Sequence, residues 1–191
     1  MLRSVTPAED VFSITWNIGP RCNFSCRYCP PKLHDKVSPH ASLDLLKQRW
    51  LDILDKTSHR NKKYKIGFTG GEVTINPDFL DFLFWLRSCY SDQISSLGFT
   101  TNGSASKAYY HRAIEAVDWI SFSSHFEFAN EKKLKTNILA THIKAFKLKK
   151  QIFVNVMDEK EYPTQVQDLI EFCEKNRISY SNNIINWNRN A

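Results

Sequence analysis

The segment Cys22-Asn23-Phe24-Ser25-Cys26-Arg27-Tyr28-Cys29-Pro30 is the most informative stretch of this chain. Its cysteines have the spacing C-x3-C-x2-C, and a stretch typical of a β-strand comes directly before them. Thiolates are the usual protein ligands of iron–sulfur clusters. Three of them on one short loop can bind three corners of a cubane and leave the fourth iron open. We therefore predict that Cys22, Cys26 and Cys29 hold a [4Fe–4S] cluster.

A zinc ion is the main alternative for this loop, because zinc also binds thiolates. A structural zinc ion usually takes four protein ligands, often as two separated pairs. His34 or His40 could complete a Cys3His site. The segment 125–127 has the H-x-E pattern of zinc deaminases, but that pattern should precede the paired cysteines, and here it follows them. Zinc is therefore disfavoured but stays open.

The other cysteines do not suggest disulfide bonds. The chain has five cysteines, an odd number, and Cys89 and Cys173 stand alone in helical patterns. We expect both to be buried core thiols, since unpaired cysteine is among the most buried residue types. A metal site in a reducing compartment accounts for this cysteine usage better than a disulfide framework does.

Length and composition predict a single domain over residues 1–191, with 42% hydrophobic and 13% aromatic residues to build a core. No apolar run approaches the roughly 20 residues that a membrane span needs. The N-terminus lacks the apolar stretch of a secretory signal. These features predict a cytoplasmic protein with no membrane partner.

The formal net charge of +6 comes largely from lysines that cluster at 132–135 and 144–150. Such runs usually form the solvated face of a helix, although an acidic or phosphorylated partner is an alternative. Aromatic residues do not interleave with these lysines as a stacking platform for bases would require. Nucleic acid is therefore a disfavoured partner.

Short apolar runs alternate along the chain with longer helical patterns. We predict strands at 11–18, 64–69, 96–101, 118–124, 151–157 and 178–185. Helices are expected at 42–56, 105–117 and 131–149. Two more should begin at Asn76-Pro77-Asp78, running to about Ser88, and at a capping box of Thr164 and Gln167, running to Lys175. This alternation predicts an α/β domain with a parallel sheet.

Three of the predicted strands have one apolar and one polar face. In the strand 118–124, Ile120 and Phe122 oppose Ser121 and Ser123, and the strands 96–101 and 151–157 alternate in the same way. The apolar faces suit a layer of helices. The polar faces suit a ligand cavity, because buried hydroxyls and amides are costly without partners. Hydrogen bonding within the protein is the alternative explanation.

Two motifs of the sequence resemble the radical SAM superfamily. Its signature is C-x3-C-x2-C directly after the first strand, with an aromatic residue at the place of Tyr28. Gly70-Gly71-Glu72, at the end of the second predicted strand, looks like the family's GGE motif. The resemblance covers residues 11 to about 185 and implies a partial (β/α)6 barrel of parallel strands. It also implies an active site at the C-terminal ends of the strands, without an auxiliary-cluster domain.

The resemblance further implies a mechanism that depends on S-adenosylmethionine. In the family, the open iron binds the amino and carboxylate groups of that cofactor. An electron from the reduced cluster then cleaves it to a 5′-deoxyadenosyl radical, which abstracts hydrogen from the substrate. The cofactor carries the chemistry, while the protein supplies binding and orientation.

Roles follow for matching positions. The backbone around Tyr28 is expected to meet the adenine, and the stretch Thr69, Gly70, Gly71 and Glu72 the methionine amino group, where glycine permits close approach. Residues expected to hold the ribose and carboxylate are Asn102, Ser121 or Ser123, and Asn155, with 182–184 near the adenine. Candidate substrate or catalytic residues at strand ends are Trp16, Asn17, His125, Glu127 and Met157.

Several subtypes fit this family. The substrate is expected to be a peptide or a small metabolite, changed by epimerisation, cross-linking or dehydrogenation. Activation of a glycyl-radical partner enzyme and deazaguanine biosynthesis are alternatives. A non-catalytic zinc- or cluster-binding module would be a different class. An enzyme of this family needs an electron donor such as flavodoxin or ferredoxin, and a partner protein could supply a missing C-terminal region.

Overall fold

The computed structural model describes residues 10–185 and contains one sheet of six parallel strands in the order β1-β2-β3-β4-β5-β6. The strands are β1 (Val11–Asn17), β2 (Lys63–Thr69), β3 (Ile94–Thr101), β4 (Trp119–Ser124), β5 (Gln151–Asp158) and β6 (Ser179–Ile184). The helices are α1 (Leu43–Thr57), α2 (Phe79–Tyr90), α3 (Lys107–Ala116), α4 (Glu131–Lys147) and α5 (Pro163–Lys175). Short 3-10 turns are η1 (Pro31–Leu33), η2 (Ser58–Arg60) and η3 (Val73–Ile75).

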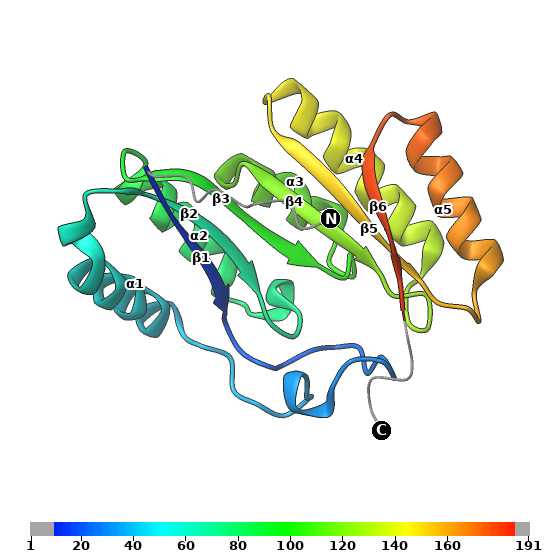
Figure 1. The fold of residues 1–191 in the computed structure, drawn as a ribbon, viewed down its shortest axis with the longest axis horizontal. Coiled ribbons are helices and arrows are strands. Elements are labelled where there is room, and N and C mark those ends of the chain that lie inside the picture. The colour runs from blue at the N-terminus through cyan, green and yellow to red at the C-terminus, as the bar shows by residue number, and fades with distance from the viewer. Residues whose placement is uncertain (1–9, 186–191) are drawn as a thin grey trace, which may run out of the picture.

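The strand order places all five helices on the same side of the sheet. Each strand lies beside its predecessor, in one direction, and crossovers between parallel strands are almost always right-handed. Figure 1 shows the helices following the outside of the curved sheet. Side chains on this outer face are almost fully buried: Ile66, Phe68, Leu97, Phe99, Ile120, Phe122, Val154 and Val156. The predicted partial (β/α)6 barrel is confirmed, as an open sheet rather than a closed one.

Three helices begin at polar side chains that accept a hydrogen bond from the first turn. Ser42 Oγ accepts from the Leu45 amide at 3.3 Å, and Ser106 Oγ accepts from the Tyr109 amide at 3.1 Å. Asn130 Oδ1 accepts from the Lys133 amide at 2.9 Å. Each cap satisfies a donor that the helix itself leaves unpaired.

Two predicted helix starts were wrong. Asn76 does not cap α2, because its Oδ1 accepts from the Asp78 amide at 2.9 Å and forms a separate turn before the helix begins at Phe79. The capping box at Thr164 does not form either, since α5 already begins at Pro163. Proline suits this first position because it has no N–H to satisfy.

The prediction of two buried thiols was half right. Cys173 is fully buried, but Cys89 is exposed near the end of α2. The buried stripe of α2 consists of Phe79, Phe82, Leu83 and Leu86. Cys89 lies beside this stripe and not on it. The apolar residues that flank it in the sequence therefore predicted burial wrongly.

An indole ring from the start of β4 packs across the inner face of β2 and β3. Gly67, Gly98 and Trp119 are register partners on β2, β3 and β4. A Cβ atom at Gly98 would lie 2.1 Å from Trp119 Cδ2, so glycine is needed for the indole to pack against the sheet.

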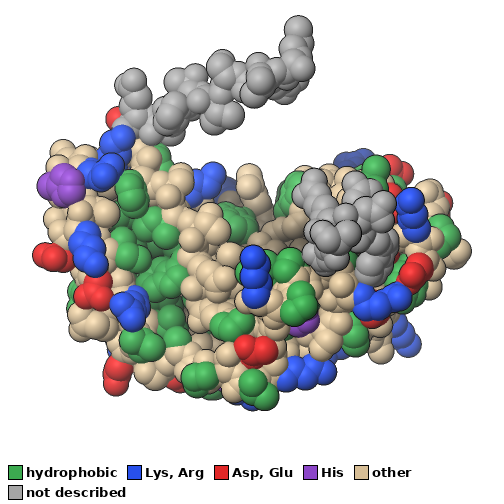
Figure 2. Space-filling view, turned by 60° about the horizontal axis from the view of Figure 1, so that its bottom comes forward, with side chains coloured by type: hydrophobic (Ala, Val, Ile, Leu, Met, Phe, Trp, Pro, Cys, Tyr) green, Lys and Arg blue, Asp and Glu red, His purple; other side chains and the backbone are tan. Residues whose placement is uncertain are grey.

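A groove follows the outer edge of β1. It lies between β1 and α1, with Ile14, Trp16, Leu45 and Ile53 among the residues that line it. Figure 2 shows hydrophobic side chains gathered in a strip beside charged ones on this side of the molecule. Among the described residues, no helix combines the length and apolar character needed to cross a membrane.

Candidate functional site

A cavity of about 470 Å³ lies where β1 to β4 end and the cysteine loop crosses the sheet. Figure 1 shows this loop running along the edge of the sheet to which the strands point. All three loop cysteines line the cavity. The predicted residues that also line it are Asn17, Tyr28, Thr69, Gly70, Gly71, Glu72, Asn102, Ser123 and His125. Residues distant in sequence thus meet at one site.

The two glycines of the segment 70–72 lie directly against the backbone of the cysteine loop. The Gly71 amide donates to Gly19 O, and the Glu72 amide to Arg21 O, both at 2.9 Å. A Cβ atom at Gly71 would lie only 2.2 Å from Arg21 O. Sequence reasoning attributed these glycines to a close approach by the methionine amino group. The close approach that the structure contains is between two backbone segments, which fixes the start of the loop.

The carboxylate of Glu72 is fully engaged inside the protein. Its Oε1 accepts from the amide and hydroxyl of Thr74, at 3.0 and 2.6 Å, and from the Thr101 hydroxyl at 2.8 Å. Its Oε2 accepts from the Asn102 amide at 2.6 Å. Burial raises the pKa of Glu72, while these donors lower it. The side chain therefore ties the ends of β2 and β3 together, and its backbone is the part that borders the cysteine loop.

The three thiols differ in exposure, and burial raises the pKa of each. Cys26 is buried and its pKa rises to about 12, while Cys22 and Cys29 are half-buried. Without a metal these groups hold their protons, so iron has to displace them on binding. The Phe24 amide donates to Cys22 Sγ at 3.4 Å. Hydrogen bonds of this kind are typical around the ligands of iron–sulfur clusters.

The donor set fits a cubane cluster. Three thiols from one backbone-clamped loop line a single cavity. Within residues 10–185, no three Cys, His, Asp or Glu side chains converge closely enough to bind a single metal ion. A cubane binds each thiolate through a different iron atom, so it requires a wider spacing than one ion does. His34 also lines the cavity, and its Nδ1 lies 3.3 Å from Pro30 O.

Aromatic side chains hold the middle of the cysteine loop against the segment after β4. The rings of Tyr28 and His125 are nearly parallel, with an interplanar angle of 17°, and the Tyr28 hydroxyl is hydrogen-bonded to His125 Nδ1. Phe24 meets the same imidazole edge-on and stacks on Phe128. Burial lowers the pKa of His125 to about 4, so the ring is neutral at neutral pH.

Glu127 has a positioning role in the structure. The backbone amide of Arg27 donates to Glu127 Oε2 at 3.0 Å, and Arg27 Nε donates to Oε1 at 3.1 Å. The same guanidinium also pairs with Glu161 after β5. Sequence reasoning named Glu127 as a catalytic candidate. Its two oxygens instead join the cysteine loop to the loop after β4.

The remaining predicted residues lie outside the cavity. Asn155 Nδ2 donates to Ser121 Oγ at 2.9 Å and to Ser123 Oγ at 3.4 Å, so Ser121 and Asn155 satisfy each other. This internal bonding is the alternative that the sequence left open. Met157 does not line the cavity either, and the Trp16 ring packs on Phe68 and Phe82. Asn182 and Asn183 are exposed.

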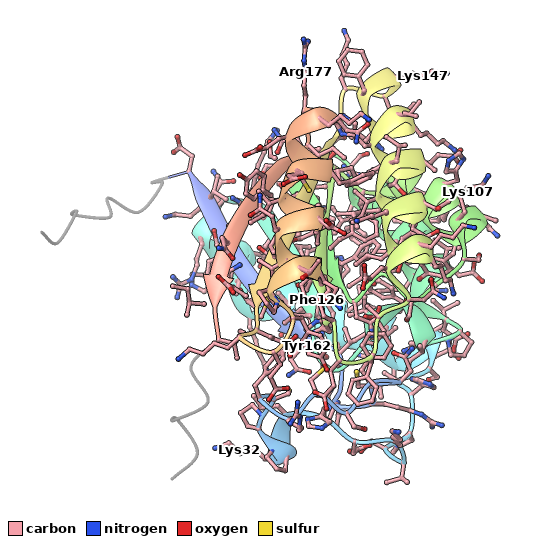
Figure 3. The ribbon with its side chains drawn as sticks, turned by 90° about the vertical axis from the view of Figure 1, so that its right-hand side faces the viewer. Lys32, Lys107, Phe126, Lys147, Tyr162 and Arg177 are labelled. Atoms are coloured by element: carbon pink, nitrogen blue, oxygen red, sulfur yellow. The ribbon has the colours of Figure 1, made fainter. Side chains whose placement is uncertain are left out.

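Sequence reasoning missed Arg27 and Glu159. Glu159 follows β5 and is fully buried, and its carboxylate has no side-chain hydrogen-bond partner among the described residues, although the Phe126 backbone lowers its pKa. Burial, and to a smaller degree repulsion from Glu127, raise its pKa to about 7. Figure 3 shows Phe126 and Tyr162 lying together at this level, between α5 and the loop that carries Lys32. Glu159 lies in the charged run 158–161, which sequence alone suggests to be solvated.

Comparison with known sequences identifies related proteins over most of the chain. The family model described as Radical SAM superfamily matches residues 16–158. Molybdenum cofactor biosynthesis protein 1 of Bos taurus is 36% identical over 87 residues, which are 46% of this chain and 13% of that protein. GTP 3′,8-cyclase of Campylobacter curvus is 32% identical over 120 residues, 62% of this chain and 35% of the cyclase.

Solved structures share the fold at low sequence identity. Streptococcus suis SuiB matches with a TM-score of 0.65 and 18% identity, over 91% of this chain and 40% of that one. A structure of anSMEcpe with bound AdoMet matches with a TM-score of 0.63 and 13% identity, over 92% of this chain and 50% of that one. The chain thus spans half or less of the length of these proteins.

Proposed function

Because the chain belongs to the radical SAM superfamily, we propose that it uses a [4Fe–4S] cluster and S-adenosylmethionine to remove a hydrogen atom from a peptide or small-metabolite substrate. Enzymes of this superfamily use that cluster and that cofactor. One observation carries the proposal for this chain. The three cysteines of the motif and the glycines at 70 and 71 line one cavity at the C-terminal ends of the strands.

The residues of the cavity divide into three groups by their chemistry. Cys22, Cys26 and Cys29 would hold three irons of the cluster. Neutral polar groups of Thr69, Thr100, Asn102 and Ser123 would hold the ribose and amino-acid parts of the cofactor. The rings of Tyr28 and His125 form a flat wall that suits its adenine. One-electron cleavage of the bound cofactor is the chemistry that the cluster supplies when it is loaded.

The protein's own contribution is to fix these groups in place before any ligand binds. The backbone bonds from residues 71 and 72 hold the first half of the loop. Arg27, Glu127 and Glu161 hold the second half. A preorganised site of this kind does not have to order its own loop when the substrate arrives. Residues 10–185 would act as one domain, since a single sheet carries every group of the site.

The lining also bears on the class of substrate. It consists of thiols, aromatic rings, neutral polar groups and the internally bonded Glu72. Such a lining suits a neutral or zwitterionic substrate. A second candidate is a nucleoside triphosphate, because the sequence match to GTP 3′,8-cyclase covers 62% of this chain. A triphosphate normally binds Arg or Lys, and those cations would have to come from outside this cavity.

The test is anaerobic. Purified protein is reconstituted with iron and sulfide, reduced with dithionite and incubated with S-adenosylmethionine, and 5′-deoxyadenosine is measured by mass spectrometry. We expect the product with the wild-type chain and none with Cys26→Ala, while Cys89→Ala, outside the site, keeps wild-type yield. A fully loaded cluster that binds S-adenosylmethionine and never cleaves it, with or without candidate substrates, would contradict the proposed activity.

A further inference from the structure

The first strand of the sheet has one edge with no neighbouring strand. β1 pairs only with β2, so its other edge is open among the residues that the structure describes. Asp10 O accepts from the amide of the first residue of β2 at 3.2 Å, and the Ile18 amide donates to the last residue of β2 at 3.0 Å. Successive residues of a strand direct their backbone groups to opposite edges. Those of Ser13 and Thr15 therefore point to the open edge.

This edge carries none of the features that usually keep other chains from pairing with it. Edge strands are commonly protected by charged residues, proline or a bulge. The sequence of β1, Val-Phe-Ser-Ile-Thr-Trp-Asn, contains no charge and no proline, and it pairs with β2 in continuous register. Ser13 and Thr15 are also exposed. The edge can therefore accept an additional strand.

The groove between β1 and α1 runs along this edge and reaches the cavity that the cysteines line. Its volume is about 460 Å³, and its apolar walls include Ile14, Trp16, Leu45 and Ile53. Asn17, the last residue of β1, lines both the groove and the cavity. A chain that lies in the groove therefore has one end at the site of the proposed chemistry.

The charged residues of the groove lie on its helix wall. α1 returns from the end of β1 to the start of β2, so its last turn lies toward the start of β1. Arg49 pairs with Asp52 at 3.9 Å, whereas Lys56, in that last turn, has no ion pair among the described residues. From Leu45 to Lys56 the helix rises by about 17 Å, which an extended segment of about five residues spans. A cation at this distance from the cavity suits an acidic side chain.

We propose that the substrate is a peptide, and that a segment of about five residues binds as an added strand along the open edge of β1 and leads the reacting residue past Asn17 into the cavity. The inference rests on the proposed function and narrows its substrate class, because only an extended chain can use the groove and the cavity together. In complexes of this kind, backbone hydrogen bonds supply affinity, and pockets for alternate side chains supply specificity. Here alternate side chains would contact the apolar walls, and an acidic one would pair with Lys56.

The experiment uses a library of random peptides of about 12 residues, long enough to span groove and cavity, displayed on their mRNA. It is selected anaerobically on the full, reconstituted chain, and the Kd of the tightest peptide is measured by fluorescence anisotropy. We expect the selected peptides to share alternating apolar residues and an acidic residue. Leu45→Glu should weaken binding about tenfold, because it places a charge on the apolar wall that the peptide would cover.

The matched control is Leu51→Glu on the same helix. Leu51 is 44% exposed and Leu45 is 45% exposed, but Leu51 does not line the groove. This control should bind the peptide as the wild type does. Thr15→Pro is a second test, since it removes one N–H from the open edge, where a strand tolerates proline. It should weaken binding by a similar factor.

Three results would overturn the inference. One is a library from which no peptide is enriched, and another is equal binding by the wild type, Leu45→Glu and Thr15→Pro. The third is a dimer, seen by light scattering, that Leu45→Glu dissociates and Leu51→Glu does not, because the edge would then bind a second copy of the chain. Formation of 5′-deoxyadenosine by a chain that selects no peptide would leave the proposed function standing. A chain that binds the peptide and never cleaves S-adenosylmethionine would contradict the proposed function instead.

Discussion

Replacement of Gly71 by alanine tests whether the segment 70–72 holds the cysteine loop. The new Cβ atom would lie 2.2 Å from Arg21 O and 2.4 Å from Pro20 O. Ordinary contacts begin at about 3.4 Å, so the loop has to move by about 1 Å. The neighbouring atoms belong to the backbone, so no side chain can rotate out of the way. The loop start must separate from the end of β2.

The cost follows from what that separation breaks. The amides of Gly71 and Glu72 lose their bonds to Gly19 O and Arg21 O, both 2.9 Å long. Each bond contributes roughly 0.5–1.5 kcal/mol net. Residual overpacking adds roughly 1–3 kcal/mol. We expect Gly71→Ala to lower the free energy of unfolding by about 3 kcal/mol and to reduce iron binding, because Cys22 follows directly after Arg21.

Urea unfolding of the metal-free protein and iron analysis after reconstitution measure the two effects. The matched control is Gly67→Ala in the same strand, β2, where the Cβ atom would lie 3.3 Å from the Trp119 ring. That ring can yield by a few tenths of an ångström, so the loss should stay below about 1 kcal/mol, within the usual range for such a change. The reasoning is refuted if Gly71→Ala unfolds at the wild-type urea concentration and binds a full complement of iron.

Three further perturbations follow from the same contacts. Glu72→Gln should lower the free energy of unfolding by about 2–4 kcal/mol, because the new side-chain N–H₂ would face the Thr74 hydroxyl or the Asn102 amide, which now donate to a carboxylate oxygen. A melting temperature equal to that of the wild type would contradict this prediction. Arg27→Ala keeps the backbone bond to Glu127 but removes the guanidinium pairs with Glu127 and Glu161, so it should speed amide hydrogen exchange in residues 22–29 and lower cluster retention. Arg112→Ala, which breaks a pair with Asp81 at 3.7 Å, should change neither, and equal exchange in both variants would refute a role for Arg27. Burial raises the pKa of Glu159 from 4.5 to about 7, so ionisation of this carboxyl destabilises the folded chain as pH rises through that interval. Over this pH range the free energy of unfolding should fall by about 1–3 kcal/mol more in the wild type than in Glu159→Gln. Parallel pH profiles of the two proteins would exclude this cost.

The fold was predictable because the spacing of apolar residues along a strand or helix shows which of its faces is buried. The alternation of Ile120 and Phe122 with Ser121 and Ser123 predicted which side of β4 meets the helices, and the structure places them so. The helix starts near Asn76 and Thr164 were less predictable. A polar side chain can accept from a turn as readily as from a helix, and local sequence does not decide between the two.

The site was predictable only where its residues carry their own signal. The cysteine spacing predicted which loop would hold a cluster, and the order of the strands brings Gly71 beside that loop. The pairing of Arg27 with Glu127 spans 100 residues. Nothing in a single sequence indicates that an arginine between two cysteines has its partner in another loop. Burial of Glu159 was hidden for the same reason, since the charged run 158–161 in which it lies gives no sign of it.

The most direct test of the account is the resonance spectrum of the reduced, reconstituted protein with and without S-adenosylmethionine. Three cysteine ligands leave one iron open, so we expect the signal of a reduced [4Fe–4S] cluster that changes shape when S-adenosylmethionine is added. Iron and sulfide should each be close to four per chain, as a cubane requires. A cluster whose spectrum ignores S-adenosylmethionine, or a protein that binds zinc in place of iron, would contradict the central claim.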